Sequence, residues 1–416
     1  MAVLPAPEKQ ETLTPGVAAD AWYSASSPSQ SAGRTRRQGG ISPRTRSVLD
    51  WLTVAGCVYV LIAAVGIIGS GFSLAVGDQA AELFSFASNP LVGLMIGVVA
   101  TALIQSSTTT TATTVGLVAG GLPLEIAVPI ILGANIGTTL TNTLVSFAMV
   151  RDREQFRRGF AAATVYDMFN LLAVVIFVPL EMMFGLLERL ATAGAGALSG
   201  ADAGVVADVF GGVGSLVNGA TTPLTFLVGA GAGWLPGVWS GVVMIVVGIV
   251  MILAVITLIG RKLKALLVGR AQQILHTAMG RGPLSSIGSG FLVTAMVQSS
   301  TTATSLMVPL AGSGALTLRQ IYPFTLGANI GTTLTALIAS FAFDGELATI
   351  ALTAGLVHFI YNVLAVALIF GLPGLRYLPV RGAQWLADLA TRRKLYAVAW
   401  VLGVFLALPL TLIVLL

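Results

Sequence analysis

The sequence predicts an all-α membrane protein with two inverted-topology repeats, each holding a re-entrant broken-helix hairpin beside spanning helices. Three observations support this fold class. Hydrophobic residues make up 56% of the 416 residues and charged residues only 9%, against about 25% charged in an average soluble domain. Several apolar stretches are long enough to cross a bilayer. Two polar motifs occur twice, once in each half of the chain.

Membrane-spanning helices need about 20 mostly apolar residues. The stretches that meet this requirement are residues 48–72, 123–149, 159–185, 236–260, 320–343, 347–372 and 395–416. Two further apolar regions, 88–120 and 284–316, are interrupted by runs of Ser and Thr. We therefore expect each of these two regions to be broken.

Composition divides the chain into four segments. Residues 1–46 are rich in Pro, Ser, Thr and Arg, and we expect a disordered basic cytoplasmic tail because such a segment buries too little apolar surface to fold. Residues 47–190 form the first transmembrane repeat half, and residues 236–416 form the second. Residues 191–235 between them are rich in Gly and Ala, which we interpret as an external linker.

The placement of Lys and Arg predicts the orientation in the membrane. The net charge is +5, but the basic residues lie in short clusters between apolar stretches, so no nucleic-acid partner is predicted. Such clusters are typical of cytoplasmic loops. With the tail and residues 151–158, 261–281 and 376–394 on the cytoplasmic side, the two broken regions must enter from opposite faces. We expect a multi-pass protein of the cell (cytoplasmic) membrane with a cytoplasmic N terminus.

Comparison of the chain with itself independently supports a duplication. Gln105-Ser106-Ser107-Thr108-Thr109 recurs at residues 298–302, and the ten residues 132–141, LGANIGTTLT, recur unchanged at 326–335. FNLLAV at 169–174 resembles YNVLAV at 361–366. Inverted halves with breaks in corresponding positions predict a transport site near the bilayer midplane, where the breaks meet.

The repeated Ser- and Thr-rich motif suits an oxyanion. Its hydroxyl and amide groups can donate hydrogen bonds to phosphate oxygens, and backbone N–H groups at a half-helix N-terminus favour an anion. The same oxygens could instead face sodium, or the side chains could serve only helix packing. The predicted phosphate-binding residues are Gln105, Ser106, Ser107, Thr108, Gln298, Ser299, Ser300 and Thr301.

The repeated GANIGTT segment is the second candidate. Its glycines could serve only close helix packing. Its polar side chains, however, bring oxygen ligands to the same neighbourhood, and we expect these residues to take part in sodium binding directly or indirectly: Asn135, Thr138, Asn329 and Thr332.

Ionisable residues inside a membrane span are functional candidates. Asp167 lies within the 159–185 span without a local basic partner, so either a sodium ion compensates its charge or it is a structural, hydrogen-bonded acid. Asn170 is three residues further on and lies on the same helical face. His358 could respond to protons, although a core histidine with satisfied hydrogen bonds is the simpler interpretation.

With these motifs placed, the chain resembles the type II sodium-dependent phosphate cotransporters and is identified as a bacterial-type member. The resemblance covers residues 48–410 and includes both QSS motifs, both GANIGTT segments, RDREQFRR, ATVYDMFN, HFIYN and RYLPVR. It implies sodium-coupled symport of inorganic phosphate across the cytoplasmic membrane, electrogenic with divalent phosphate, with the two QSS hairpins forming the phosphate site.

The resemblance also implies roles for individual residues. Ala161, Ala163 and Asp167 match the pattern of the electrogenic members, in which the acid helps to bind an additional sodium ion. A second sodium site would map to Asp152, Asn170 and Thr332. Met149 and Ala328 stand where other members have oxygen ligands for that site.

Other functions fit the sequence less well. The alternative is a sodium-coupled symporter of another oxyanion, a dicarboxylate or sulfate, because Ser/Thr-rich hairpins suit any oxyanion. A channel fits inverted broken repeats less well than a carrier does. An enzyme is not expected, because the sequence shows no His cluster, Ser-His-Asp set or paired catalytic carboxylates. We expect no cofactor; sodium is the only expected metal, and it is a coupled substrate. The expected partners are phosphate, sodium and the lipid bilayer. The sequence leaves the formation of a homo-oligomer open.

Overall fold

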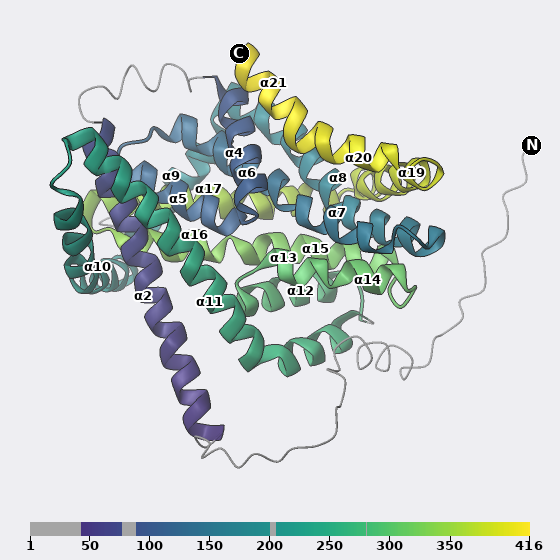
Figure 1. Ribbon diagram of the computed structural model, residues 1–416, viewed down its shortest axis with the longest axis horizontal. Coiled ribbons are helices and arrows are strands. Elements are labelled where there is room, and N and C mark those ends of the chain that lie inside the picture. Colours follow the sequence, from purple (N-terminus) through teal and green to yellow (C-terminus); the bar gives the residue numbers. More distant parts are fainter. Residues whose placement is uncertain (1–42, 77–88, 200–204, 280) are drawn as a thin grey trace, which may run out of the picture.

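The computed structural model describes residues 43–76, 89–199, 205–279 and 281–416, and every regular element in these ranges is helical. Figure 1 shows the helices and the two chain ends. The predicted disordered tail lies outside the described residues up to residue 42. Helix α2 (Pro43–Val76) begins at Pro43, so the last four residues assigned to the tail are helical.

The predicted membrane spans are confirmed. By length and composition, seven helices of the described chain could cross a membrane. They comprise α2, α6 (Leu124–Thr138) with α7 (Leu140–Ser146) and η2 (Phe147–Met149), α8 (Arg153–Phe184), α11 (Gly237–Met279), α15 (Leu318–Thr332) with α16 (Leu334–Ala339) and η4 (Ser340–Ala342), α17 (Gly345–Ala365) with the π-helix η5 (Val366–Phe370), and α20 (Leu395–Leu402), η6 (Gly403–Ala407) and α21 (Leu408–Leu415). The last of these spans, formed by α20, η6 and α21, follows the helices α18 (Pro373–Arg376) and α19 (Leu378–Arg392).

Both Ser/Thr-rich regions are broken at the same motif position. In the first half, α4 (Pro90–Ile104) and α5 (Ser107–Ala119) flank the break. In the second half, α12 (Pro283–Val297) is followed by the short helices α13 (Ser300–Ser305) and α14 (Met307–Gly312). The repeat therefore extends from the sequence to the local structure, while the opposite orientation of the halves in the membrane stays a prediction.

The segment expected to be a linker is largely helical. It contains most of α9 (Leu186–Ser199) and all of α10 (Val205–Ala232). Ala and Leu favour helix strongly enough to offset the cost of glycine in these segments. Helix α9 packs against α17, and α10 packs against α2. The 191–235 segment therefore adds helices that pack against the spanning helices, and its external position stays a prediction.

Glycines allow the closest helix contacts. A Cβ atom at Gly133 of α6 would lie 2.0 Å from the Leu94 carbonyl oxygen on α4, and one at Gly97 of α4 would lie 2.1 Å from the Ile130 carbonyl oxygen. Helices α12 and α15 pack in the same way through Gly290 and Gly327. The GANIGTT glycines thus bring each spanning helix against the first half-helix of its hairpin.

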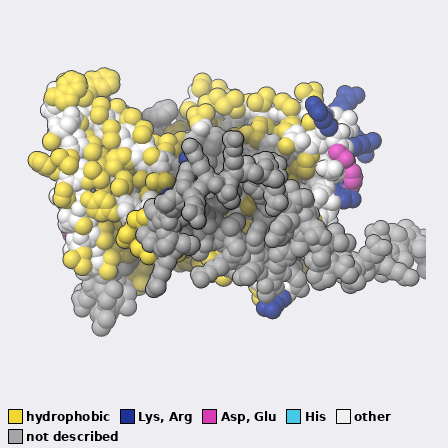
Figure 2. Space-filling view, turned by 60° about the horizontal axis from the view of Figure 1, so that its bottom comes forward, with side chains coloured by type: hydrophobic (Ala, Val, Ile, Leu, Met, Phe, Trp, Pro, Cys, Tyr) yellow, Lys and Arg dark blue, Asp and Glu magenta, His cyan; other side chains and the backbone are white. Residues whose placement is uncertain are grey.

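Two surfaces of the molecule differ in composition. Hydrophobic side chains cover most of the surface that Figure 2 shows in colour, whereas most of the visible Lys, Arg and acidic side chains gather at its right end and a smaller basic group lies at the lower edge. In the membrane-spanning part, the long helices α2 and α11 pack together, and Lys262 of α11 forms a 2.6 Å ion pair with Asp50 of α2. The apolar surface fits contact with lipid.

The packing of α12 on α15 yields a prediction about stability. A methyl group at Gly290 would meet the Phe324 carbonyl oxygen at 2.0 Å, so we expect Gly290→Ala to lower the free energy of unfolding by about 1–3 kcal/mol, the usual range for overpacking. Denaturant unfolding of the detergent-solubilised protein measures this. Gly288→Ala is the matched control, because it adds the same methyl group to α12 where nothing lies within 4 Å. Equal stability of both variants would contradict the packing.

Candidate functional site

Each break is held by the glutamine that opens the repeated motif. Gln105 and Gln298 are the non-glycine residues with positive φ in the described chain, at 59° and 55°. The amide nitrogen of Gln298 donates to the Ala295 carbonyl oxygen at 2.7 Å, and its Oε1 accepts a 2.7 Å hydrogen bond from Thr335. Gln105 makes the equivalent bonds with Ala102 and Thr141. Each glutamine amide therefore uses one N–H and its oxygen to hold the break and keeps a second N–H for a ligand.

The first serine of each motif starts the second half-helix. Ser106 and Ser299 have extended backbones, and their hydroxyls accept hydrogen bonds from the backbone N–H of Thr109 at 3.2 Å and of Thr302 at 3.1 Å. This is the geometry of a helix N-cap. The sequence predicted phosphate contacts for these serines, but in this structure their hydroxyl groups are engaged in capping.

The next two residues of each motif keep their hydroxyls more available. Ser107 and Ser300 open α5 and α13 and are buried, with 4% and 2% of their surface exposed. The hydroxyls of Ser107, Thr108 and Thr301 make no hydrogen bond with a described residue, and the Ser300 hydroxyl lies near the Tyr166 side chain. These four hydroxyls are the part of the predicted phosphate site that does not hold the break.

Several neighbouring threonines form hydrogen bonds within their own helix. Thr111 and Thr114 donate to backbone carbonyl oxygens one turn earlier, at 2.9 and 2.8 Å, and Thr304 donates to the Ser300 carbonyl oxygen at 2.7 Å. Such bonds satisfy a hydroxyl inside a helix without a ligand. The polar runs therefore combine helix-internal hydroxyls with the free hydroxyls at the break.

The GANIGTT asparagine of the first half is held by the second half. Asn135 of α6 donates its amide N–H to the Oδ1 atom of Asn362 at 3.2 Å, and its own Oδ1 lies 3.1 Å from Nε2 of His358. Both partners are on α17. Because the Asn135 oxygen must be the acceptor, the hydrogen-bond network assigns the proton of His358 to Nε2.

The same pattern recurs with the halves exchanged. Asn329 of α15 donates to Oδ1 of Asn170 on α8 at 2.8 Å and accepts a hydrogen bond from the Tyr166 hydroxyl. Asn170 also donates to the Asn135 carbonyl oxygen at 3.0 Å, which joins the two sets. We call these six buried residues the asparagine clasp: Asn135, Tyr166, Asn170, Asn329, His358 and Asn362.

Three of the predicted sodium ligands belong to the clasp. The structure brings Asn135, Asn170 and Asn329 together, but their carboxamide groups already bind each other or their clasp partners. Thr138 and Thr332 are buried, and each donates to a carbonyl oxygen of its own helix, at 2.9 and 3.0 Å. A threonine oxygen that donates one hydrogen bond keeps lone pairs for a cation.

Sequence reasoning did not select Tyr166 as a site residue. The signal was present in the sequence, because Tyr166 precedes Asn170 by four residues, as His358 precedes Asn362. This spacing places both residues of each pair on one helical face, so the repeat could have identified Tyr166 as the counterpart of His358.

Asp167 is a buried carboxylate whose two oxygens differ. It is 1% exposed, and Oδ2 accepts hydrogen bonds from the Trp400 indole N–H at 2.8 Å and from the Thr143 hydroxyl at 3.3 Å. Oδ1 is buried and has no hydrogen-bond partner among the described residues. No sequence pattern indicated Trp400, which is 233 residues away from Asp167 along the chain.

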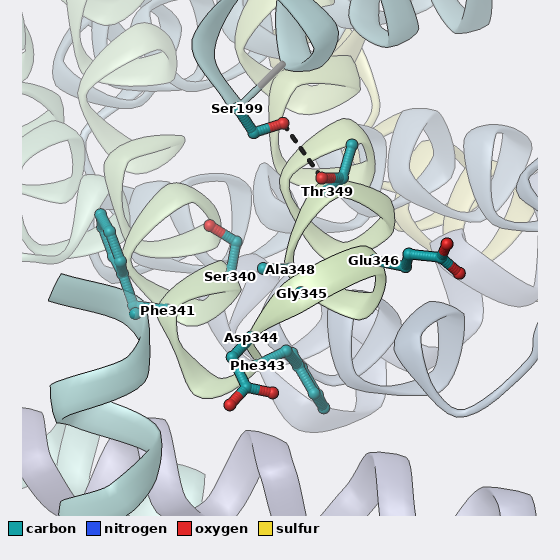
Figure 3. A pocket seen from close by; sticks show the side chains of 10 residues that line it. Ser199, Ser340, Phe341, Phe343, Asp344, Gly345, Glu346, Ala348 and Thr349 are labelled. Carbon is teal, nitrogen blue, oxygen red and sulfur yellow. Dashed lines mark hydrogen bonds between the residues drawn. The ribbon is translucent and has the colours of Figure 1, made fainter. Parts of the chain in front are cut away.

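A surface pocket near the 340–349 turn contains no predicted site residue. Figure 3 shows its lining, where Ser199 and Thr349 form a 3.0 Å hydrogen bond and Glu346 points away from the other labelled side chains. Its position apart from both breaks and from Asp167 gives it no part in the predicted chemistry.

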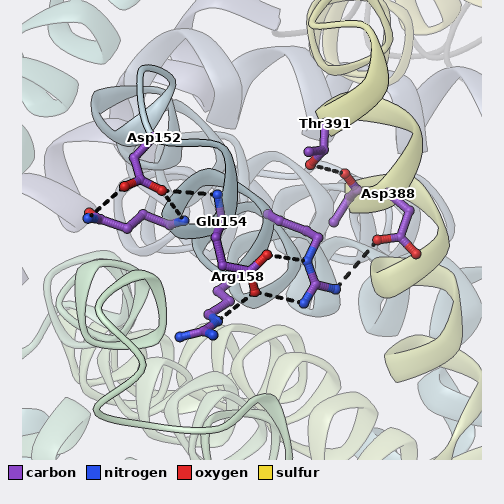
Figure 4. Close-up of polar contacts among 8 residues, drawn as sticks. Asp152, Glu154, Arg158, Asp388 and Thr391 are labelled. Carbon is purple, nitrogen blue, oxygen red and sulfur yellow. Dashed lines mark hydrogen bonds and ion pairs between the residues drawn. The ribbon is translucent and has the colours of Figure 1, made fainter.

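Asp152 lies apart from the other predicted sodium ligands. It is exposed and caps α8, accepting hydrogen bonds from the backbone N–H groups of Glu154 and Gln155 (Figure 4). Asn170 is 18 residues further along the same helix, about 27 Å away at 1.5 Å per residue. One ion cannot bind both residues, so the structure does not bring together the set Asp152, Asn170 and Thr332.

The turn around Asp152 is an ion-pair network at a surface. Glu154 forms 2.9 Å ion pairs with Arg157 and Arg158, and Arg157 also lies 3.5 Å from Asp388 of α19 (Figure 4). All of these side chains are about half exposed. Exposed pairs of this kind contribute little stability each, and they link the start of α8 to α19.

The family model and the similar proteins of known name indicate the same family. The model of the Na+/Pi-cotransporter family matches residues 60–198 and 250–373, which is more than half of the chain. The rat sodium-dependent phosphate transport protein 2A is 31% identical over 419 residues, covering 85% of this chain and 66% of the rat protein. The human sodium-dependent phosphate transport protein 2B is 30% identical over 446 residues, covering 86% and 64% of the two chains. The chain thus spans slightly less than two thirds of the length of these relatives. No solved structure matches the chain.

The asparagine clasp yields a prediction about stability. Tyr166→Phe leaves the buried Oδ1 atom of Asn329 without this donor, so we expect the free energy of unfolding to fall by about 1–2 kcal/mol. Denaturant unfolding in detergent measures it. The matched control is Tyr361→Phe, because Tyr361 is equally buried and its hydroxyl has no hydrogen-bond partner among the described residues. A larger loss in the control than in Tyr166→Phe would contradict the clasp.

Proposed function

We propose that this chain, which belongs to the Na+/Pi-cotransporter family, is a secondary transporter in which sodium drives inorganic phosphate across the cell membrane. The names of the rat and human relatives supply the ion and the substrate. The arrangement of the two breaks and of Asp167 supplies the groups that would bind them.

The observation that carries the proposal is the pair of equivalent breaks. Each break is fixed by a glutamine and capped by a serine, which leaves Ser107 and Thr108 in one half and Ser300 and Thr301 in the other for the ligand. Hydroxyls are hydrogen-bond donors, and the first N–H groups of α5 lack partners within the helix. A tetrahedral oxyanion matches such a set of neutral donors. We propose that phosphate binds to both breaks.

The charges of the buried groups favour coupling to a cation. Among the described residues, the buried polar set consists of hydroxyl and amide side chains together with Asp167 and His358, without a buried Lys or Arg. Phosphate would then bind without a buried basic side chain of the described residues to balance its charge, while Asp167 adds a negative charge to the same protein interior. Two like charges in a medium of low dielectric repel each other strongly. We propose that sodium ions bound with phosphate compensate this charge.

The membrane potential sets the amount of work that sodium must supply. Divalent phosphate entering a cell with a negative interior moves two charges against about 2.3 kcal/mol per charge per 100 mV, or roughly 4.6 kcal/mol. Three sodium ions would make the transported complex net positive. The potential would then assist uptake, which is the electrogenic form of the proposal.

We assign the sodium ligands according to the contacts in the structure. Oδ1 of Asp167 is the free carboxylate oxygen, and Thr143 lies beside the same carboxylate. Thr138 and Thr332 offer further hydroxyl oxygens. Asn135 and Asn329 act through the clasp, which positions the GANIGTT segments that carry these threonines.

The first prediction from this function concerns transport by the purified protein. Uptake of labelled phosphate into proteoliposomes should require an inward sodium gradient and accumulate phosphate above the external concentration. An equal potassium gradient should give only background uptake. Excess sulfate or succinate should leave the signal unchanged; if either abolishes it, the substrate is another oxyanion.

Serine variants localise the substrate in the same assay. Ser107→Ala and Ser300→Ala each remove a hydroxyl from a break with few other donors, so we expect the phosphate concentration for half-maximal uptake to rise about tenfold. Ser313→Ala is the control, because Ser313 is exposed and donates to the Leu310 carbonyl oxygen. Wild-type uptake in both break variants would exclude the two-break site.

A further prediction concerns Asp167 and voltage. If Asp167 binds the sodium ion that makes the complex positive, Asp167→Gly should transport phosphate with little response to a potassium diffusion potential, while wild-type uptake increases with a negative interior. Asp388→Gly is the control, since Asp388 is an exposed acid on α19. An unchanged voltage response in Asp167→Gly would refute this assignment.

A further inference from the structure

The carboxylate of Asp167 is oriented by a residue from the far end of the chain. The Trp400 indole N–H donates to Oδ2 at 2.8 Å, and the Thr143 hydroxyl donates to the same oxygen at 3.3 Å. Oδ1 is also buried but has no hydrogen-bond partner among the described residues. The two donors therefore bind one oxygen of the carboxylate and leave the other oxygen without a hydrogen bond.

The position of the Trp400 ring is set by packing. Trp400 lies on α20 and packs against the buried cluster that includes Phe156 and Phe160 of α8 and Leu386 of α19. Elsewhere in the Leu395–Leu415 segment only Ala397, Phe405 and Pro409 are buried. Most of this segment therefore faces outward, and Trp400 is the side chain through which it forms a hydrogen bond with the core.

The chemistry of the indole group limits what Trp400 can do. An indole N–H is only a donor, so it cannot be a ligand of a cation. A buried carboxylate oxygen without a donor, by contrast, is costly unless a proton or a cation binds it. The arrangement has no duplicate in the second half, because alignment of Phe169-Asn170 with Tyr361-Asn362 places Phe359 opposite Asp167.

We propose that Trp400 is a positioning residue of the sodium site: its N–H holds Oδ2 of Asp167 so that Oδ1 faces the ion. The inference rests on the proposed function, since it assigns a further residue to sodium coupling. It also links the C-terminal span to the ion site, because Trp400 lies on α20.

Tryptophan fluorescence tests the contact directly. The purified protein is titrated with sodium chloride against choline chloride at constant ionic strength, without phosphate. We expect a saturable change in emission as the ion binds beside the hydrogen-bonded indole. Trp400→Phe should remove most of this change, and Trp385→Phe should keep it, because Trp385 is 62% exposed on α19.

The same variants are compared in phosphate uptake. Trp400→Phe keeps an aromatic ring but loses the donor, so we expect the sodium concentration for half-maximal uptake to rise about tenfold, as for the loss of one hydrogen bond to a charged group. Uptake at saturating sodium should stay within about twofold of wild type. A side chain with only a packing role would instead lower the amount of folded protein and leave the sodium dependence unchanged.

A second variant of the chain allows the same test if Trp400→Phe does not fold. It retains Trp400 as its only tryptophan, with Phe at positions 22, 51, 234, 239 and 385. Sodium should change its emission, and adding Asp167→Asn should abolish the change.

The outcomes separate this inference from the proposed function. The role of Trp400 would be overturned if Trp400→Phe showed the same sodium-induced emission change and the same sodium dependence of uptake as the wild type. It would also be overturned if the protein with Trp400 as its only tryptophan took up phosphate with sodium but showed no emission change on sodium addition. If wild-type uptake needs no sodium gradient, the proposed function fails. A sodium response of Trp400 that depends on Asp167 would still support the ion site in that case.

Discussion

The hydrogen bonds of the asparagine clasp are the interaction on which the rest of the arrangement depends. Asn135 and Asn329 belong to different halves, and each is held by a helix of the other half, through His358 and Asn362 or through Tyr166 and Asn170. A carboxamide buried in apolar surroundings is costly when unpaired. The need to satisfy these groups therefore fixes how the two halves meet, and with it the position of the GANIGTT segments and of the threonines that follow them.

Glycines and polar residues stabilise the structure around the asparagine clasp in different ways. Gly133 and Gly327 let the spanning helices approach the first half-helix of each hairpin so closely that no side chain would fit. The glutamines then bond to threonines at the end of the same segments, which fixes each break relative to its spanning helix. Packing and hydrogen bonding thus hold the two breaks in equivalent geometry and leave a few hydroxyls for a ligand. Asp167 interrupts the symmetry, since only the first half carries an acid there.

The fold could be predicted in large part because apolar length, broken segments and repeats are local features of the sequence. The seven spans and the two breaks follow from them. The helices in the 191–235 segment were not predicted, because glycine is typical of linkers although Ala, Leu and Val are also frequent there. The site was predicted in part. Gln105 and Ser106 were rightly placed at a break, but whether a side chain holds the backbone or faces a ligand depends on partners such as Thr141, which composition does not reveal. Trp400 could not be found, since its contact with Asp167 depends on tertiary packing.

We propose that the breaks and the buried carboxylate form one coupled site for phosphate and sodium. Isothermal titration calorimetry on the purified protein tests it most directly, by measuring phosphate binding at several sodium concentrations and sodium binding at several phosphate concentrations. Thermodynamic linkage requires each ligand to strengthen the other by the same factor. We expect phosphate to bind at least tenfold more tightly in saturating sodium than in choline, with an equal effect of phosphate on sodium. The same phosphate affinity in sodium and in choline would contradict the account.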